Sequence, residues 1–239
     1  MQIQAIKTDI FQKNQDLFSF LVKYFTGKIK EGDVAVITSK IVSLAEGRVI
    51  DDFNEAIKEE LIKKESDLAI KTKYTWLTIK DNTVMASAGI DESNADGRLI
   101  LLPRDSYQTA QEIMIFLKKY FKLHNLGVLI TDSRLLPLRA GVVGVALGYS
   151  GFNGVRDYVG TNDIFGRELK FSRTDVADSL ATAAVLEMGE GNEQQPLAII
   201  SKIKLDFRSS LNRHELDIDI KEDVYQPIFE NIKKINWKK

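Results

Sequence analysis

Two short apolar runs in this chain each lead into an aspartate that has hydroxyl or amide side chains beside it. The first run lies within Val84–Asn94 and leads to Asp91, and the second lies within Gly127–Ser133 and leads to Asp132. The pattern predicts two short buried strands, each of which surfaces and presents a carboxylate in a loop. Converging loops would hold a hard divalent cation, whereas separate loops would use the aspartates to form turns.

Amphipathic and β-branched segments alternate along the rest of the chain, which predicts an α+β fold with mixed sheets and packed helices. We expect helices over 14–30, 52–64, a segment after Pro103, 174–188 and 222–235, and strands over 34–41, 74–80, 127–132, 142–147 and 196–200. Asp105 is the expected N-cap of the helix after Pro103. The face of that helix expected to be buried carries Ala110, Ile113, Leu117 and Tyr120. No repeat or linker interrupts residues 1–239, so we expect a single unit, built as one body or as two intertwined subdomains.

Composition narrows the possible chemistry. The chain has no cysteine, which excludes disulfides, iron–sulfur clusters and thiolate zinc sites. Only two histidines occur, which argues against a histidine-rich metal site, and His124 is expected at a solvated helix end. The net charge of −1 gives no reason to expect nucleic acid or an anionic membrane as a partner. No basic region followed by an apolar stretch stands at the amino terminus, which favours a soluble, cytoplasmic protein.

Glycines and arginines are concentrated between Arg134 and Arg167. Glycine lets a backbone approach a ligand closely, and arginine forks suit phosphate and carboxylate oxygens. The alternative is that the glycines permit tight strand crossings and the arginines form surface ion pairs. A second glycine-rich loop, Gly189–Glu193, follows an expected helix, where Gly189 alone would account for a C-terminal cap.

The sequence lacks the common signatures of nucleotide binding. It contains no G-x-x-x-x-G-K-[ST] motif, and no G-x-G-x-x-G follows an expected strand. Neither a P-loop nor a dinucleotide-binding Rossmann unit is therefore supported. Any nucleotide would have to be held by a different architecture.

Several short motifs follow one another between residues 5 and 205. They are Gly32–Val34, Thr38–Ser43, Ala45–Val49, Ala88–Asn94, Leu101–Pro103, Thr131–Ser133, Pro137–Gly141, Val145–Gly148, Asp157–Tyr158, Asp163–Arg167 and Val176–Asp178. In this order they resemble the coenzyme F-420:gamma-glutamyl ligase family. The Ser-Arg-x-x-Pro-Leu-Arg pattern from Ser133 to Arg139 is most similar to a bacterial branch described as folate-metabolism gamma-glutamate ligases.

The resemblance implies an activity and an assembly. Such ligases use GTP to phosphorylate a substrate carboxylate, and the amine of L-glutamate then attacks the acyl phosphate to form an amide. The family's fold is an α+β body that pairs into an interwoven homodimer. The implied cofactors are Mg²⁺ or Mn²⁺ at two sites, together with K⁺. The implied partners are a small carboxylate acceptor and L-glutamate, with no nucleic acid and no membrane.

The resemblance also assigns roles to particular residues. Asp91, Asp132 and Ser133 correspond to the family's ligands for divalent cations. The positions that correspond to GTP contacts are Thr8, Asp9, Ile10, Phe11, Ser39, Asn94, Gly189, Glu190, Gly191, Asn192, Glu193, Gln194 and Gln195. On residue chemistry alone, we expect Lys40 and Arg139 to act in catalysis by adding positive charge near the phosphates or substrate carboxylates.

The chain departs from the F-420 ligases at several positions. Leu44 replaces a lysine that is common in those ligases, and Asp9 and Lys13 stand where prolines are usual. Residues 132–141 align with the pattern Asp-Thr-Phe-Gly-Arg-Pro-Trp-Arg-Asn-Gly, and the part that differs, 133–141, directly follows the expected cation ligand Asp132. This segment is therefore a candidate for contact with the acceptor, which leaves open a coenzyme F-420 precursor, a folate-like molecule or a related acceptor.

Two other functions use the same residues. A dimeric nucleotide-binding protein without catalysis would keep the fold but would have little need of a complete cation clamp. A metal-dependent phosphate-ester hydrolase would use the same oxygen ligands but would need no site for an amine. The joint presence of Asp91, Asp132, Ser133 and Asn94 favours the ligase.

Overall fold

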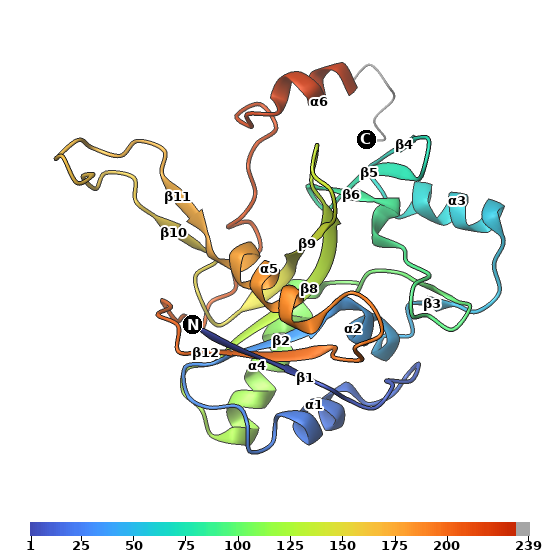
Figure 1. The fold of residues 1–239 in the computed structure, drawn as a ribbon, viewed down its shortest axis with the longest axis horizontal. Helices are drawn as coiled ribbons and strands as arrows, with labels where there is room; N and C mark the ends of the chain where they lie inside the picture. Colours follow the sequence, from blue (N-terminus) through green and yellow to red (C-terminus); the bar gives the residue numbers. More distant parts are fainter. Residues whose placement is uncertain (233–239) are drawn as a thin grey trace.

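The computed structural model describes residues 1–232 and has a mixed five-stranded sheet at its centre (Figure 1). The strands lie in the order β1 (Gln2–Ile6), β12 (Leu197–Ser201), β2 (Val34–Thr38), β8 (Gly127–Leu135) and β9 (Val142–Ser150). β2 and β8 run parallel, and the other neighbouring pairs are antiparallel. Because β2 and β8 are parallel, their carboxyl ends meet at the same edge of the sheet.

Helices cover both faces of this sheet, as the alternation of buried residues along β2 requires. Ala35 and Ile37 belong to a buried cluster with α1 (Leu17–Phe25), α2 (Ser39–Ala45) and α4 (Ser106–Phe121). Val34 and Val36 belong to a second cluster, which packs against α5 (Val176–Met188). The sheet is therefore the middle layer of the body, which makes the α+β prediction correct.

α4 follows its sequence signals closely. The side chain of Asp105 accepts a hydrogen bond from the backbone N–H of Gln108 at 2.9 Å, as expected of an N-cap. Ala110, Ile113 and Leu117 are buried, as predicted. Tyr120 is 55% exposed, so its assignment to the buried face was wrong. This helix ends one residue later, at Phe121, which packs against the core while Tyr120 points to solvent.

Other predicted boundaries shift for local reasons. α1 begins at Leu17 rather than at residue 14, because Asn14 has a positive φ of 60° and Asp16 supplies the N-cap. The predicted strand 34–41 ends at Thr38, and α2 begins at the next residue, Ser39. α5 begins at residue 176, with Asp175 as its N-cap. The last helix, α6 (Gln226–Ile232), begins later than predicted, and positions 233–235 of that prediction lie outside the described residues.

A smaller layer packs beside the carboxyl ends of β2 and β8 (Figure 1). It consists of a three-stranded antiparallel sheet of β4 (Leu68–Lys71), β5 (Trp76–Lys80) and β6 (Thr83–Ala86), together with α3 (Glu55–Lys64). The two-residue strands β3 (Val49–Ile50) and β7 (Leu99–Ile100) pair beside it. Its own small core contains Ile62, Ile90, Leu99 and Leu101. This layer carries the segment that leads to Asp91.

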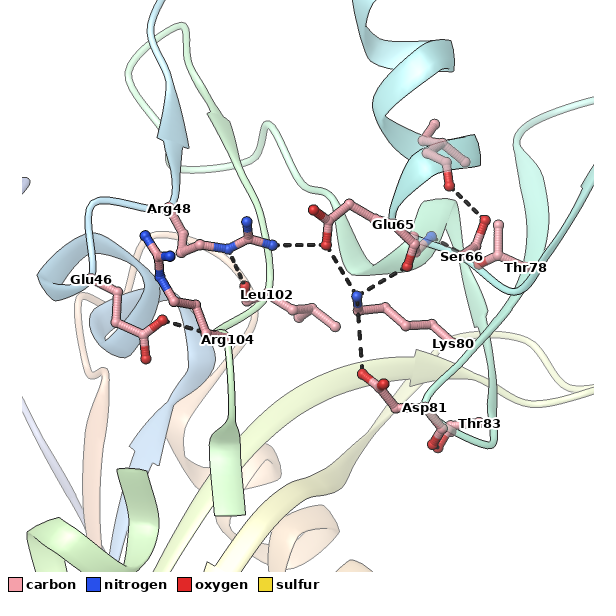
Figure 2. Close-up of polar contacts among 12 residues, drawn as sticks. Glu46, Arg48, Glu65, Ser66, Thr78, Lys80, Asp81, Thr83, Leu102 and Arg104 are labelled. Carbon is pink, nitrogen blue, oxygen red and sulfur yellow. Dashed lines mark hydrogen bonds and ion pairs between the residues drawn. The ribbon is translucent and has the colours of Figure 1, made fainter. Parts of the chain in front are cut away.

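An ionic cluster around Glu65 ties the smaller layer to the body (Figure 2). The Arg48 guanidinium donates to the Glu65 carboxylate at 2.8 Å and to the carbonyl of Leu102 at 3.1 Å. The Lys80 ammonium donates to the Glu65 carboxylate at 3.1 Å and to the Glu65 carbonyl at 3.0 Å. Burial opposes the charge on Glu65, but the hydrogen bonds from Lys80 and Arg48 outweigh it and lower the pKa below 4.5.

The glycines between residues 134 and 167 mostly serve packing. A Cβ on Gly144 would lie 2.4 Å from the carbonyl oxygen of Ala181, and one on Gly148 would lie 2.4 Å from the backbone of Ser106. These contacts let α5 and α4 approach β9 from its two sides. These two glycines therefore serve packing, as the alternative to ligand binding expected, but against helices rather than at strand crossings.

Two of the segments that project from the body (Figure 1) carry the most exposed of its apolar side chains in their loops. One is the long loop between β10 (Val155–Asp157) and β11 (Arg173–Asp175), and the other is the turn between β8 and β9. The most exposed apolar residues on them are Leu138, Ile164, Phe165 and Phe171. Within residues 1–232, no helix combines the length and the apolar character needed to cross a bilayer.

Candidate functional site

A cleft of about 370 Å³ opens at the sheet edge where β2 and β8 end, and we call it the central cleft. This is the edge at which open α/β sheets commonly bind ligands. Its walls come from the loop after β1, the start of α2, β8, and the loop between α5 and β12. The predicted site residues on its walls are Thr8, Asp9, Ile10, Phe11, Ser39, Lys40, Asn94, Asp132, Ser133, Gly189, Glu190, Gly191, Asn192, Glu193, Gln194 and Gln195.

Asp132 lies inside β8, which continues to Leu135, whereas we expected the strand to end at Asp132 and to present its carboxylate in a loop. The register with β9 shifts between Ile130 and Thr131, and Asp132 then pairs with Val145. Polar side chains are tolerated in this part of the strand because it borders the central cleft. The Ser39 hydroxyl at the start of α2 donates to Asp132 Oδ1 at 3.2 Å, which joins the ends of the two parallel strands.

Burial raises the pKa of Asp132 from 3.8 to about 6. Hydrogen bonds from the Ser133 N–H and the Ser39 hydroxyl, and the positive charge of Arg134, oppose this increase. The negative charge of the Asp91 carboxylate raises the pKa of Asp132 further, so the two aspartates interact electrostatically. Asp132 makes no salt bridge within residues 1–232, which leaves a desolvated carboxylate without a countercharge in contact.

Asp91 follows a single 3₁₀ turn, Ser87–Gly89, in which Ser87 and Ala88 both have positive φ angles. Such angles are strained for residues other than glycine and occur often at functional sites. Backbone hydrogen bonds to Ile100 at 3.0 and 2.9 Å then hold Asp91 in place. The predicted strand therefore ends at Ala86, several residues before the aspartate.

The Asp91 carboxylate is surrounded by donors. Its Oδ1 accepts the N–H of Ser93 at 2.8 Å, and its Oδ2 accepts the Ser93 hydroxyl at 2.8 Å. The Lys40 ammonium lies 2.7 Å from the same Oδ2. Burial opposes the charge, but Lys40 and Ser93 outweigh it and lower the pKa of Asp91. Asp91 is not itself among the lining residues, so Lys40 connects it to the central cleft.

Hydrogen bonds join the loops around the central cleft. The backbone N–H of Thr8 donates to the carbonyl of Gln194 at 3.1 Å, and the Gln194 side chain donates back to the carbonyl of Thr8 at 2.6 Å. The Asn94 amide donates to the carbonyl of Gly191 at 3.0 Å. Gly189 has a φ of 80° and caps α5, as predicted. The loop after β1 and the Asn94 segment are therefore both attached to the glycine-rich loop 189–195.

The carboxylate and hydroxyl oxygens beside the central cleft are suitable ligands for a divalent cation that also binds phosphate. No group of three His, Cys, Asp or Glu side chains within residues 1–232 has a metal-binding arrangement. The carboxylates of Asp91 and Asp132 and the hydroxyl of Ser133 are nevertheless suitable, because Mg²⁺ commonly uses one or two carboxylates and takes its other ligands from phosphates and water. A cationic group, the Lys40 ammonium, already contacts Asp91.

Other lining residues were not predicted. Ile41, Leu44, Val185 and Met188 form an apolar part of the wall. Their apolar character was visible in the sequence, but it is shared by every core residue of α2 and α5. Arg139 lies exposed in the turn between β8 and β9, outside the lining, and its catalytic role remains a prediction.

Known proteins are similar to this chain over most of its length. The family model for F420-0:Gamma-glutamyl ligase matches residues 5–202. A coenzyme F420:L-glutamate ligase of Methanococcus maripaludis is 33% identical over 246 residues, which cover 95% of this chain and 97% of that protein. Another, of Methanocaldococcus jannaschii, is 34% identical over 247 residues with the same two coverages. The chain therefore belongs to the F420-0:gamma-glutamyl ligase family.

Proposed function

We propose that this protein is a GTP- and divalent-cation-dependent gamma-glutamyl ligase. It would join L-glutamate to the carboxylate of a small acceptor through an acyl phosphate. One observation supports this most strongly: loops distant in the sequence hydrogen-bond to one another around a cleft that contains Asp132, a desolvated carboxylate with no salt bridge among residues 1–232. The relatives named as coenzyme F420:L-glutamate ligases support the same reaction class.

The proposed reaction has two steps. An acceptor carboxylate oxygen attacks the γ-phosphorus of GTP, the bond from that phosphorus to the bridging oxygen breaks, and GDP leaves. The amine of L-glutamate then attacks the acyl carbon, inorganic phosphate leaves with the carbon–oxygen electron pair, and the amine loses a proton. Both steps need positioning and neutralisation of charge more than covalent participation by the protein.

The residues around the central cleft suit these needs. Two divalent cations, Mg²⁺ or Mn²⁺, would supply charge neutralisation on the transferring phosphoryl group when bound. Asp91, Asp132 and Ser133 would hold them. The glycine-rich loop 189–195 would lie along the phosphates, because glycine permits close backbone approach. The apolar wall that includes Val185 and Met188 would contact the nucleotide base.

Calorimetric titration of GTP, and separately of ATP, with and without Mn²⁺ tests this proposal. We expect binding that requires the cation and favours GTP, because both the phosphates and the carboxylates are anionic and need a cation between them. Equal affinity for ATP would contradict the assignment of GTP as the substrate. Failure of both nucleotides to bind with any divalent cation would contradict the ligase assignment.

The acceptor is a carboxylate-bearing molecule of the coenzyme F-420 precursor or folate-like kind. The segment that departs from the F-420 ligases, 133–141, forms the end of β8 and the exposed turn after it. We propose that this turn contacts the acceptor rather than the nucleotide, since only Ser133 at its start lines the central cleft. Turnover measured with a coenzyme F-420 precursor and with a folate-like acceptor, each with GTP and glutamate, gives the preference of the protein for one acceptor class.

We also propose that the protein is a homodimer built through its projecting apolar segments. Large exposed apolar patches on a soluble protein mark interaction surfaces. The double variant Ile164→Asp plus Phe165→Asp is expected to sediment as a monomer, because it puts two charges into the proposed interface. Ile115→Asp, at an exposed position on α4, is the control and should remain dimeric. A monomeric wild-type protein in sedimentation analysis would contradict the proposal.

A further inference from the structure

Lys40 bridges the two layers of the molecule at the edge of the central cleft. It follows Ser39 at the start of α2 in the body, and its ammonium reaches the Asp91 segment of the smaller layer. The ammonium contacts Asp91 Oδ2 at 2.7 Å and donates to the carbonyl and hydroxyl oxygens of Ser93 at 2.8 and 2.9 Å. Three oxygen partners therefore surround one lysine nitrogen, which has three protons to donate.

These contacts occupy Oδ2 of Asp91, one of the two oxygens that a metal ion could bind. A divalent cation binds carboxylate lone pairs that carry no hydrogen-bond donor, and Oδ2 already receives both the ammonium and the Ser93 hydroxyl. A divalent cation and an ammonium at the same oxygen would also repel each other strongly. Oδ1 accepts only the Ser93 N–H, but a cation there would still lie close to the ammonium. Tight binding of a cation to Asp91 therefore favours the departure of Lys40.

Asp132 provides a contrast within the same site. It forms no salt bridge among residues 1–232, and a serine hydroxyl is its only side-chain hydrogen-bond partner there. Its oxygens are thus available to a cation in a way that those of Asp91 are not. One carboxylate of the pair is open and the other is covered by Lys40.

A nucleotide phosphate would offer Lys40 another partner. Lys40 lines the central cleft, and its side chain has four flexible methylene groups between backbone and charge. An anionic phosphate in the cleft would compete with Asp91 for the ammonium. Transfer of Lys40 from Asp91 to the phosphate would expose the carboxylate and remove the repulsive charge in a single movement.

We propose that Lys40 is an internal counter-ion that covers Asp91 in the nucleotide-free protein and so makes divalent-cation binding there depend on the nucleotide. This inference rests on the proposed function, and it adds an order of events: the nucleotide arrives first or together with its cation, and Asp91 binds a cation only afterwards. Lys40 is in this respect a gate for the cation as well as a contact for phosphate.

Mn²⁺ binding to the nucleotide-free protein, measured by the loss of the free-ion signal in electron paramagnetic resonance, tests the gate. Lys40→Met should bind Mn²⁺ about tenfold or more tightly than the wild type, because a unit positive charge in contact with the carboxylate is gone. Lys40→Gln provides a second neutral variant in case the first folds poorly. Lys40→Arg keeps the charge and should bind Mn²⁺ as weakly as the wild type.

Lys71→Met is the matched control. It removes one lysine charge from an ion pair with Glu59 on the smaller layer, a pair that does not include Asp91, and should leave Mn²⁺ affinity unchanged. Equal nucleotide-free affinity in the wild type and both neutral Lys40 variants would overturn the inference. An equal increase in Mn²⁺ affinity in Lys71→Met would also overturn it, because the increase would then come from the change in net charge.

A second set of titrations separates this inference from the proposed function. With GTP present, the wild type should bind Mn²⁺ in a complex that Asp91→Asn weakens. If that holds while the neutral Lys40 variants bind Mn²⁺ no more tightly than the wild type without nucleotide, the inference about Lys40 is wrong. The proposed cation site is then still supported. If no variant binds Mn²⁺ with or without GTP, the proposed cation site itself is wrong, and the inference falls with it.

Discussion

Replacing Asp132 with asparagine is expected to lower the Mn²⁺-dependent affinity for GTP by roughly a hundredfold or more, because even residues that only support a metal ligand commonly change affinity by 10–100-fold. Asparagine keeps the size of the side chain and one oxygen but removes the charge. Asp132 borders the central cleft and has no salt bridge within the described chain, so a cation held between it and phosphate would be its principal countercharge.

The fold should survive this change. An amide avoids the cost of a desolvated carboxylate, and it can still accept the hydrogen bond from the Ser39 hydroxyl. We therefore expect an unchanged circular dichroism spectrum and a melting temperature no lower than that of the wild type at neutral pH. Loss of GTP binding with an intact fold assigns the effect to the site.

Asp91→Asn is the companion variant and should lose cation-dependent GTP binding as well. It also removes the charged partner of Lys40, so its affinity for GTP without any cation should not fall. Asp52→Asn, at an exposed position outside the cleft, has the same charge change and is the control. Normal cation-dependent binding by both Asp91→Asn and Asp132→Asn, measured by calorimetry, would refute the proposed cation site.

Much of the fold could be predicted because local signals agreed with the tertiary structure. The β-branched run from Val34 became the central strand β2, and the Asp105 cap with its apolar face became α4. Where the signals conflicted, prediction was wrong. Ile41 and Val42 favour a strand by composition, yet they belong to α2 because their side chains enter the same core as Ile37.

The length of β8 could not be predicted from its composition. Polar residues Asp132, Ser133 and Arg134 interrupt the apolar pattern that marks a buried strand. They remain in the strand because β9 pairs with all three of them, and Asp132 and Ser133 line the central cleft. From the sequence alone, polar residues within a strand thus lead to the prediction of a loop.

The strand pattern singled out Asp91 and Asp132, and residue chemistry singled out Lys40, but the expected nucleotide contacts came only from the family resemblance. Nothing in the spacing of Thr8 and Gln194 indicates that they exchange two hydrogen bonds across the mouth of the cleft. The Lys40–Asp91 contact was likewise beyond prediction, because it joins two layers whose relative placement depends on distant interactions. One of those interactions is the Glu65 cluster.

Glu65→Gln is expected to lower the free energy of unfolding by about 3 kcal/mol, the range found when one partner of a largely buried ion pair is removed. The side chains of Glu65, Arg48 and Lys80 are only 16%, 21% and 16% exposed. Glutamine would leave two desolvated cations facing a neutral amide. For a chain of this size, the melting temperature should fall by roughly 6–12 °C.

The effect should depend on pH in a definite direction. The pKa of Glu65 is lowered in the folded protein, so its contribution is complete above the unfolded value of about 4.5 and is lost as the pH falls through the folded value. Wild type and Glu65→Gln should therefore differ most at neutral pH, and their stabilities should converge in acid. Urea unfolding at several pH values measures the free energy of unfolding of each protein as a function of pH.

Glu59→Gln is the matched control, because it breaks an ion pair with Lys71 whose lysine side chain is 64% exposed. Exposed pairs contribute at most about 1 kcal/mol, so this variant should melt close to the wild type. A Glu65 variant as stable as the control would mean that the cluster does not hold the smaller layer to the body. Because that layer positions Asp91, the destabilised Glu65 variant should also bind Mn²⁺ and GTP less tightly than Glu59→Gln at temperatures where both are folded.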